Sequence, residues 1–219
     1  MAGTTVADHH EVHHALEQAL AAEGVEVTRE EVNQVMGYPK PVAIRRLLED
    51  HPDFSSSITD DYVEQIHQDF VRRMVEHYRD SPRVSAKEGV QSTWQALRER
   101  GIRIALDTGF SRPIADAIIT RLDWARHLDA SVTSDEVERG RPYPDMIFRA
   151  MELTDVADVQ TVAKVGDTAS DMQQGTEAGC RWVIGVTTGA YSAPALQKEP
   201  HTHLIEQLPE LLELWDQIR

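Results

Sequence analysis

Cysteine is almost absent from this chain of 219 residues, and Cys180 is the single one. An intrachain disulfide and a thiolate zinc cluster are therefore excluded, which fits a reducing compartment. Basic residues are also few, with 22 Lys and Arg against 37 Asp and Glu and a formal charge of −15. Nucleic acids and anionic membranes are bound through a basic excess, so we expect neither as a partner.

Long hydrophobic runs are missing as well. No apolar stretch approaches the roughly 20 residues of a membrane helix. Charged and His residues between Asp8 and His14 follow the first residues too soon for a signal peptide. Hydrophobic residues still make up 41% of the chain, enough for a folded core. These features predict a soluble, acidic, cytoplasmic protein.

The sequence pattern divides the chain into two regions. From about Asp8 to Asp80, apolar residues recur at three- and four-residue steps, as between Tyr62 and Tyr78, which predicts helices. A capping box at Thr28-Arg-Glu-Glu31 predicts one helix start. From about residue 84, short apolar runs alternate with helical segments. The expected strands are 102–106, 130–132, 162–165 and 182–186, the expected helices 113–122, 145–151 and 171–178, and the expected loops 55–57 and 189–200.

This alternation predicts an α/β fold with a doubly wound parallel sheet and helices on both faces. Ligands of such sheets lie at the carboxyl ends of the strands. Three polar signals fall near those ends: Thr108 with Gly109, Arg141 in a Gly-Arg-Pro-Tyr-Pro segment, and Asp167 with Asp171. A hydroxyl beside backbone N–H groups, a fixed cation and two carboxylates together predict a phosphate and divalent-metal site.

The order of these motifs resembles the haloacid dehalogenase (HAD) superfamily of phosphohydrolases, and within it the phosphonatase branch. Residues 1–6 look like the end of the first family motif, Thr108 like the second, Arg141 like the third and Gly166-Asp-Thr-Ala-Ser-Asp171 like the fourth. The resemblance implies a Rossmann-like core of residues 1–7 and 84–219, with an all-helical cap domain of residues 8–83 inserted in it. It also implies a homodimer through the cap helices.

The resemblance assigns roles to individual residues. Mg²⁺ would be held by the Ala2 carbonyl, Asp167 and Asp171. The phosphoryl group would be bound by Gly3, Thr108, Gly109 and Arg141, and the catalytic side chains would be Lys40, Thr108 and Arg141. The implied substrate is a small phosphorylated or phosphonylated metabolite.

Two details favour the phosphonatase branch. Ala2 stands where common HAD phosphatases carry a second Asp, which protonates an alkoxide leaving group. Met36-Gly-Tyr-Pro-Lys40 resembles the phosphonatase segment whose lysine forms a Schiff base with an aldehyde. Because a carbanion is a very poor leaving group, C–P cleavage needs an iminium to accept the electrons. Lys40 then needs a lowered pKa to be neutral and nucleophilic.

Two departures from the family pattern keep alternatives open. The family's nucleophilic Asp would stand immediately before Met1, together with the first strand, so we expect Met1 to be internal to a longer protein. The alternative is a chain that begins at Met1 and cannot form an aspartyl-phosphate. Ala43 stands where phosphonatase has His, and prolines flank Lys40 on both sides. An ordinary HAD phosphomonoesterase and a catalytically silent phosphate-ligand-binding protein therefore remain open.

Simpler interpretations accompany each candidate. Lys40 and Arg141 can each be plain surface charges. The four histidines near the N-terminus include pairs at metal-binding spacing, although a solvated helix face is the favoured interpretation. Asp107 receives no role, and Cys180 is expected to be a buried, inert thiol. The four histidines are His9, His10, His13 and His14.

Overall fold

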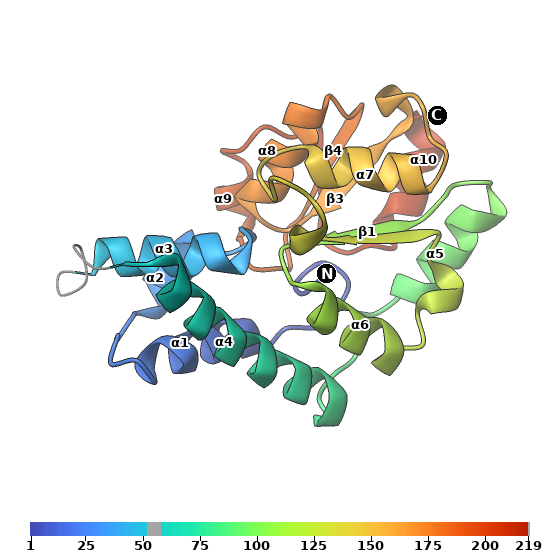
Figure 1. The fold of residues 1–219 in the computed structure, drawn as a ribbon. Coiled ribbons are helices and arrows are strands. Elements are labelled where there is room, and N and C mark those ends of the chain that lie inside the picture. The colour runs from blue at the N-terminus through green and yellow to red at the C-terminus, as the bar shows by residue number, and fades with distance from the viewer. Residues whose placement is uncertain (52–57, 219) are drawn as a thin grey trace.

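The structure is a computed structural model that describes residues 1–51 and 58–218. The first region folds into helices, as predicted, and these form one body beside the sheet (Figure 1). Helices α1 and α3 pack against α4, and α2 packs against α1. The expected loop at 55–57 lies outside the described residues. The four helices are α1 (Glu11–Ala21), α2 (Arg29–Gln34), α3 (Lys40–Asp50) and α4 (Asp60–Asp80).

Local sequence signals account for these helices. The capping box of α2 is present, because Glu31 N–H donates to Thr28 Oγ1 at 3.3 Å and Thr28 N–H donates to Glu31 at 2.7 Å. Thr59 caps α4 in a similar way by accepting a bond of 3.2 Å from Tyr62 N–H. The apolar stripe of α4 is buried at every predicted position, which are Val63, Ile66, Phe70, Met74 and Tyr78.

The second region alternates strands and helices. Its elements are α5 (Val90–Glu99), β1 (Ala105–Thr108), α6 (Arg112–Arg121), η1 (Ala125–His127), β2 (Ala130–Thr133), η2 (Ser134–Glu136), α7 (Asp145–Leu153), η3 (Val159–Thr161), β3 (Ala163–Gly166), α8 (Ala169–Ala178), β4 (Trp182–Val186), α9 (Ala193–Leu196), β5 (His203–Ile205) and α10 (Glu210–Ile218).

Three details differ from the sequence prediction. The strand expected at 102–106 is β1, which begins later because the Ile102 N–H still bonds back to Leu97 at the end of α5. The loop expected at 189–200 contains the short helix α9. Strand β5 was not predicted, since its three residues are too few to show a period.

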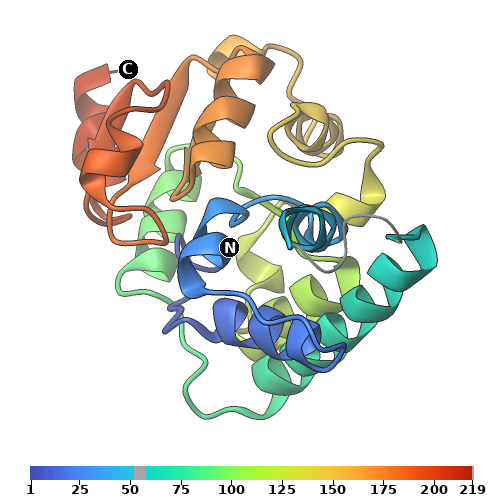
Figure 2. The ribbon, with the colours of Figure 1, turned by 90° about the vertical axis from the view of Figure 1, so that its left-hand side faces the viewer.

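All strand pairs are parallel. β1 pairs with β2, from Ala105 opposite Ala130 to Thr108 opposite Thr133, and the second group has the order β3-β4-β5. Helices α7 and α8 lie on one face of the strands, and α5 and α10 lie on the other (Figures 1 and 2). The predicted doubly wound α/β class is therefore confirmed. None of the described helices has the length and apolar character needed to cross a membrane.

Candidate functional site

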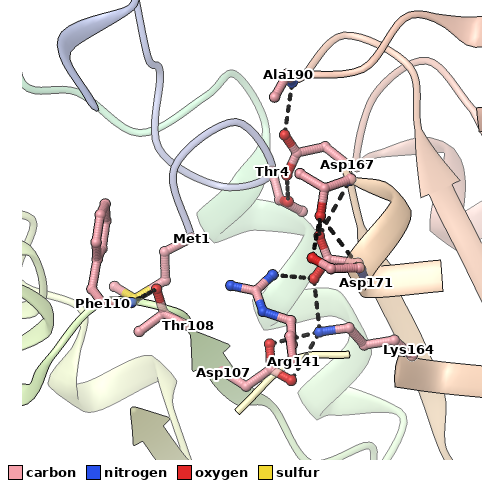
Figure 3. Close-up of polar contacts among 12 residues, drawn as sticks. Met1, Thr4, Asp107, Thr108, Phe110, Arg141, Lys164, Asp167, Asp171 and Ala190 are labelled. Carbon is pink, nitrogen blue, oxygen red and sulfur yellow. Dashed lines mark hydrogen bonds and ion pairs between the residues drawn. The ribbon is translucent and has the colours of Figure 1, made fainter. Parts of the chain in front are cut away.

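The candidate site lies at the carboxyl ends of β1 and β3. Thr108 is the last residue of β1, and Asp167 directly follows β3. Arg141 comes from the segment before α7, and Asp171 from the first turn of α8. Figure 3 shows these side chains gathered in one place, with Met1 beside Thr108. Parallel strands place their carboxyl ends at one edge, which is why motifs far apart in the sequence meet here.

Asp167 is held in a close-fitting setting. It is 2% exposed, and its two carboxylate oxygens accept hydrogen bonds from Thr4 Oγ1 at 2.5 Å and from the Ala190 N–H at 2.8 Å. Gly3 lies against the carboxylate, because an added Cβ there would come within 2.1 Å of Oδ2. Gly3 also has a φ of +82°, a conformation that favours glycine. The lack of a side chain at Gly3 therefore lets the backbone lie directly against the Asp167 carboxylate. The phosphate-binding role of Gly3 stays a prediction.

Asp171 is saturated with polar partners. Its Oδ1 forms ion pairs with Arg141 and, at 3.1 Å, with Lys164 Nζ. Its Oδ2 accepts hydrogen bonds from the Thr168 hydroxyl at 2.6 Å and the Thr168 N–H at 3.2 Å. Burial opposes ionisation of this carboxyl, but the charges of Arg141 and Lys164 and the Thr168 bond outweigh it. Together they hold the pKa of Asp171 well below its ordinary value.

Lys164 and Asp107 form a buried ion pair to which the sequence analysis gave no role. Lys164 Nζ lies 2.6 and 2.8 Å from the two carboxylate oxygens of Asp107. Since Lys164 is on β3 and Asp107 is on β1, the pair joins the two groups of strands (Figure 3). A chain of alternating charges therefore runs from Arg141 through Asp171 and Lys164 to Asp107. The sequence could have indicated this pair, because each of two short apolar strands contains one charged residue and a buried charge without a partner is not tolerated.

Arg141 combines a fixed charge with an unused donor. It is 7% exposed, so its interpretation as a surface charge is wrong. Within the part of the chain that the structure describes, its Nε has no hydrogen-bond partner. Leaving a buried guanidinium N–H without an acceptor is costly, so this donor is available to an anionic ligand such as a phosphoryl oxygen.

The carboxylates of the site suit a divalent cation. Burial and then the charge of Asp171 raise the pKa of Asp167, as expected for two buried carboxylates that repel each other. Mg²⁺ is typically held by one or two carboxylates together with substrate phosphate and water. Ala2, the expected carbonyl ligand, lies partly buried next to Gly3. Among residues 1–51 and 58–218, no group of three or more Asp, Glu, His or Cys side chains forms a metal site unaided.

The segment 36–40 of the helical region reaches all three core motifs. An added Cβ on Gly37 would lie 2.2 Å from Ser170 Oγ, and one on Gly109 would lie 2.8 Å from the Tyr38 carbonyl oxygen. One on Gly140 would lie 2.3 Å from the Pro39 ring. Glycines therefore allow the segment to pack directly over the site. The family resemblance implies that Gly109 binds phosphate, and this role stays a prediction beside its packing role.

Lys40 lies at the end of this segment, as the first residue of α3. It is 3% exposed, so its interpretation as a solvated surface lysine is wrong. Its ammonium nitrogen lies 5.8 Å from the ring centres of both Phe70 and Phe110. Burial, and then the charge of Arg141, lower the pKa of Lys40 to about 8, and Asp8 opposes the shift. A buried amine with this pKa is a nucleophile near neutral pH.

One histidine also departs from expectation. His13 is 2% exposed, and its Nε2 lies 2.6 Å from Asn33 Oδ1. The expected solvated face of α1 is therefore wrong at this position, although His14 is exposed. His10 packs edge-on against His13, with ring centres 5.4 Å apart. Cys180 is partly buried, and burial raises its thiol pKa to about 11, which agrees with an inert thiol.

Comparisons with known proteins identify the family of this chain. Residues 3–185 match the family model described as haloacid dehalogenase-like hydrolase. A phosphonoacetaldehyde hydrolase from Bacillus cereus (strain G9842) is 33% identical over 199 residues, which cover 87% of this chain and 74% of the relative.

Solved structures share the fold at lower identity. A phosphonoacetaldehyde hydrolase-like protein from Oleispira antarctica has a TM-score of 0.82 at 20% identity, covering 99% of this chain and 89% of the other. CbbY from Rhodobacter sphaeroides, solved in complex with phosphate, has a TM-score of 0.80 at 19% identity, covering 96% and 93%. Because the family model matches residues 3–185 and the Bacillus cereus relative is 33% identical over 87% of this chain, we conclude that the chain belongs to the haloacid dehalogenase-like hydrolase family.

Proposed function

We propose that the protein is a phosphonatase-like hydrolase that cleaves a C–P or P–O bond of a small phosphorylated or phosphonylated metabolite. The observation that carries this proposal is the buried amine of Lys40. It packs against Phe110, two residues beyond Thr108, and its pKa of about 8 makes the free amine accessible near neutral pH. A hydrolase of simple phosphate esters has no need of such an amine, whereas C–P cleavage beside an aldehyde does.

The proposed chemistry uses Lys40 together with a carboxylate that the family resemblance implies before Met1 and that the printed sequence does not include. The Lys40 amine condenses with the aldehyde carbonyl and water leaves, which produces an iminium. A carboxylate at the position before Met1, where the family has its nucleophile, attacks phosphorus. The C–P bond then breaks, and its electron pair moves into the iminium to form an enamine. Water hydrolyses the acyl phosphate to phosphate and free carboxylate, while protonation and hydrolysis of the enamine release the aldehyde and Lys40.

The other residues orient the phosphoryl group and stabilise its charge. Arg141 offers the Nε that has no partner among the described residues. Thr108 is buried at the end of β1, where its hydroxyl accepts a hydrogen bond of 3.2 Å from the Phe110 N–H. Asp167 would hold Mg²⁺ directly with the Ala2 carbonyl. Asp171, with both oxygens engaged, would act through water. Bound Mg²⁺ would neutralise phosphoryl charge. The expected homodimer through the cap helices and the cytoplasmic location stay predictions.

The proposal is tested by phosphate release in Mg²⁺ buffer, from phosphonoacetaldehyde and from a panel of phosphate monoesters. The chain as printed is compared with one extended before Met1 by a strand that ends in Asp. We expect phosphonate cleavage only in the extended chain, lost in Lys40→Met and kept in the exposed control Lys198→Met.

Other outcomes select the alternatives. Ester hydrolysis that survives Lys40→Met, with no phosphonate cleavage, identifies an ordinary phosphomonoesterase. Phosphate binding without turnover in both chains identifies a silent binding protein.

A further inference from the structure

Two loops that are far apart in the sequence enclose the carboxylate of Asp167. The first loop is residues 1–6, and the second loop is residues 187–191, which follow β4. Figure 3 shows Thr4 from the first loop and Ala190 from the second, each hydrogen-bonded to the same carboxylate. The position of each loop therefore decides how Asp167 is held.

Both loops approach Asp167 through a glycine. An added Cβ on Gly3 would lie 2.1 Å from Asp167 Oδ2, and one on Gly189 would lie 2.2 Å from Asp167 Cβ. Among residues 1–51 and 58–218, no hydrogen bond joins the first loop directly to the second. A third group is therefore needed to hold the loops at a fixed separation around the carboxylate.

The side chain of Lys87 connects the two loops. Its ammonium nitrogen donates to the Gly3 carbonyl at 2.8 Å, to the Thr188 carbonyl at 3.0 Å and to the Thr188 hydroxyl at 2.9 Å. All three acceptors are uncharged oxygens. An ammonium group has three protons, so these bonds use every donor that Lys87 has. The group is therefore engaged in joining the loops and has no donor left for a phosphoryl oxygen.

Lys87 is itself fixed to the first loop. Its backbone N–H donates to the Thr5 carbonyl at 2.9 Å. Gly3 is held on both sides, because its N–H donates to the Val6 carbonyl at 3.0 Å and its carbonyl accepts from Lys87. The Ala2 carbonyl shares a planar peptide group with the Gly3 N–H, so its direction is fixed as well.

The charge of Lys87 acts against a bound cation. Burial lowers the pKa of Lys87 and the charge of Asp167 opposes this shift, which indicates that the two groups lie close enough to interact. A cation at Asp167 is repelled by an ammonium group nearby. Loss of the charge alone would therefore tighten cation binding, whereas loss of the link between the loops would weaken it.

We infer that Lys87 is a positioning residue that holds the two loops together around Asp167 and so fixes the Asp167 carboxylate and the Ala2 carbonyl in the arrangement that receives a divalent cation. The part that concerns the cation rests on the proposed function, in which these two groups hold Mg²⁺. The joining of the loops does not rest on it.

Three variants test the inference beside the unsubstituted chain. Lys87→Met removes the charge and the donors at similar length, Lys87→Arg keeps both, and Lys198→Met is the exposed control. The Kd for Mg²⁺ is measured by calorimetric titration. Amide hydrogen exchange is followed by NMR at Ala190, which bonds to Asp167, and along β4 at 182–186, which reports on the rest of the core.

We expect Lys87→Met to weaken Mg²⁺ binding by about tenfold, which is the lower end of the effect of removing a group that orients metal ligands. Exchange at Ala190 should accelerate by about tenfold while exchange along β4 stays unchanged, because only the loops are released. Lys87→Arg should fall between Lys87→Met and the unsubstituted chain, since its planar donor group fits the three acceptors less well. Lys198→Met should change neither quantity.

The sign of the effect separates positioning from charge. Tighter or unchanged Mg²⁺ binding in Lys87→Met would overturn the inference, and so would unchanged exchange at Ala190. Equal acceleration at Ala190 and along β4 would also overturn it, because that result means a general loss of stability. Absence of Mg²⁺ binding by the unsubstituted chain would instead contradict the proposed function, and exchange at Ala190 would then decide whether Lys87 joins the loops.

Discussion

The ammonium group of Lys40, which begins α3, lies 5.8 Å from the ring centre of Phe110, which follows the end of β1. This contact joins the helical region to the core at the candidate site. The same nitrogen lies 5.8 Å from the Phe70 ring on α4, so aromatic side chains flank the amine in a dry setting. Aromatic faces attract a cation, but the loss of water outweighs that attraction here and lowers the Lys40 pKa to about 8.

The lowered pKa predicts how the reactivity of Lys40 depends on pH. Below about pH 8 most of the amine is protonated and only its minor free form can attack a carbonyl, whereas above about pH 8 the free amine dominates. Borohydride trapping of the protein with an aldehyde should therefore rise through a midpoint of about pH 8, followed by mass spectrometry of the Lys40 peptide. The exposed Lys198 is the internal control. A midpoint for Lys40 equal to that of Lys198 would show that burial does not tune this amine.

Stability gives a second view of the same group. Between about pH 8 and 10.5 the unfolded chain keeps the Lys40 proton while the folded chain releases it, so the contribution of Lys40 to stability rises with pH. Below pH 8 the folded protein buries the charge, so Lys40→Met should stabilise it by up to about 3 kcal/mol. That advantage should shrink from pH 8 to 10.5 in urea unfolding, and a constant difference across this range would contradict it.

The effects of substituting Lys164 and Asp107 on the free energy of unfolding should depend strongly on each other, because the two side chains form a buried ion pair. Lys164→Met leaves two carboxylates without their shared cation and should destabilise the protein by about 3–5 kcal/mol. Asp107→Asn leaves Lys164 paired with Asp171, so its effect should be smaller, about 1–3 kcal/mol. Urea unfolding of both variants and of the double variant gives a double-mutant cycle, which measures the interaction free energy of the two side chains. Additive effects would show that the two side chains do not interact as the structure places them.

Much of the fold could be predicted from the sequence because its signals are local. The stripe of α4, the capping box at Thr28 and the apolar run of β4 each depend on neighbours within a few residues. The site motifs could also be located, since they follow strands whose ends meet. The Asp107–Lys164 pair could not, because 57 positions separate the partners and each residue alone looks like an isolated charge. The burial of His13 was missed for a related reason, since its partner Asn33 belongs to another helix.

Gly37 should be essential for placing Lys40 over the site. Its φ of +89° is strained for any other residue, and an added Cβ would lie 2.2 Å from Ser170 Oγ. Gly24 has a similar φ of +78° but nothing within 4 Å of an added Cβ, so Gly24→Ala isolates the backbone strain of about 1–2 kcal/mol. Gly37→Ala should show that strain and also expose Lys40 to aldehyde trapping at a higher midpoint pH. Identical behaviour of the two variants would mean that the contact with Ser170 positions nothing.

Magnesium should stabilise the folded protein through Asp167. A cation that binds only the folded state, at a concentration 100 times its Kd, adds about 2.7 kcal/mol of stability. For a chain of this size that corresponds to a rise of about 5–10 °C in melting temperature. Asp167→Asn should abolish the rise, because it removes the charge that the neighbouring Asp171 repels.

The matched control is Asp158→Asn. Asp158 lies before η3 and away from the site motifs, so this variant should keep the full effect of magnesium. A magnesium response that survives Asp167→Asn would place the cation elsewhere, and would remove Asp167 from the metal-holding role given to it here.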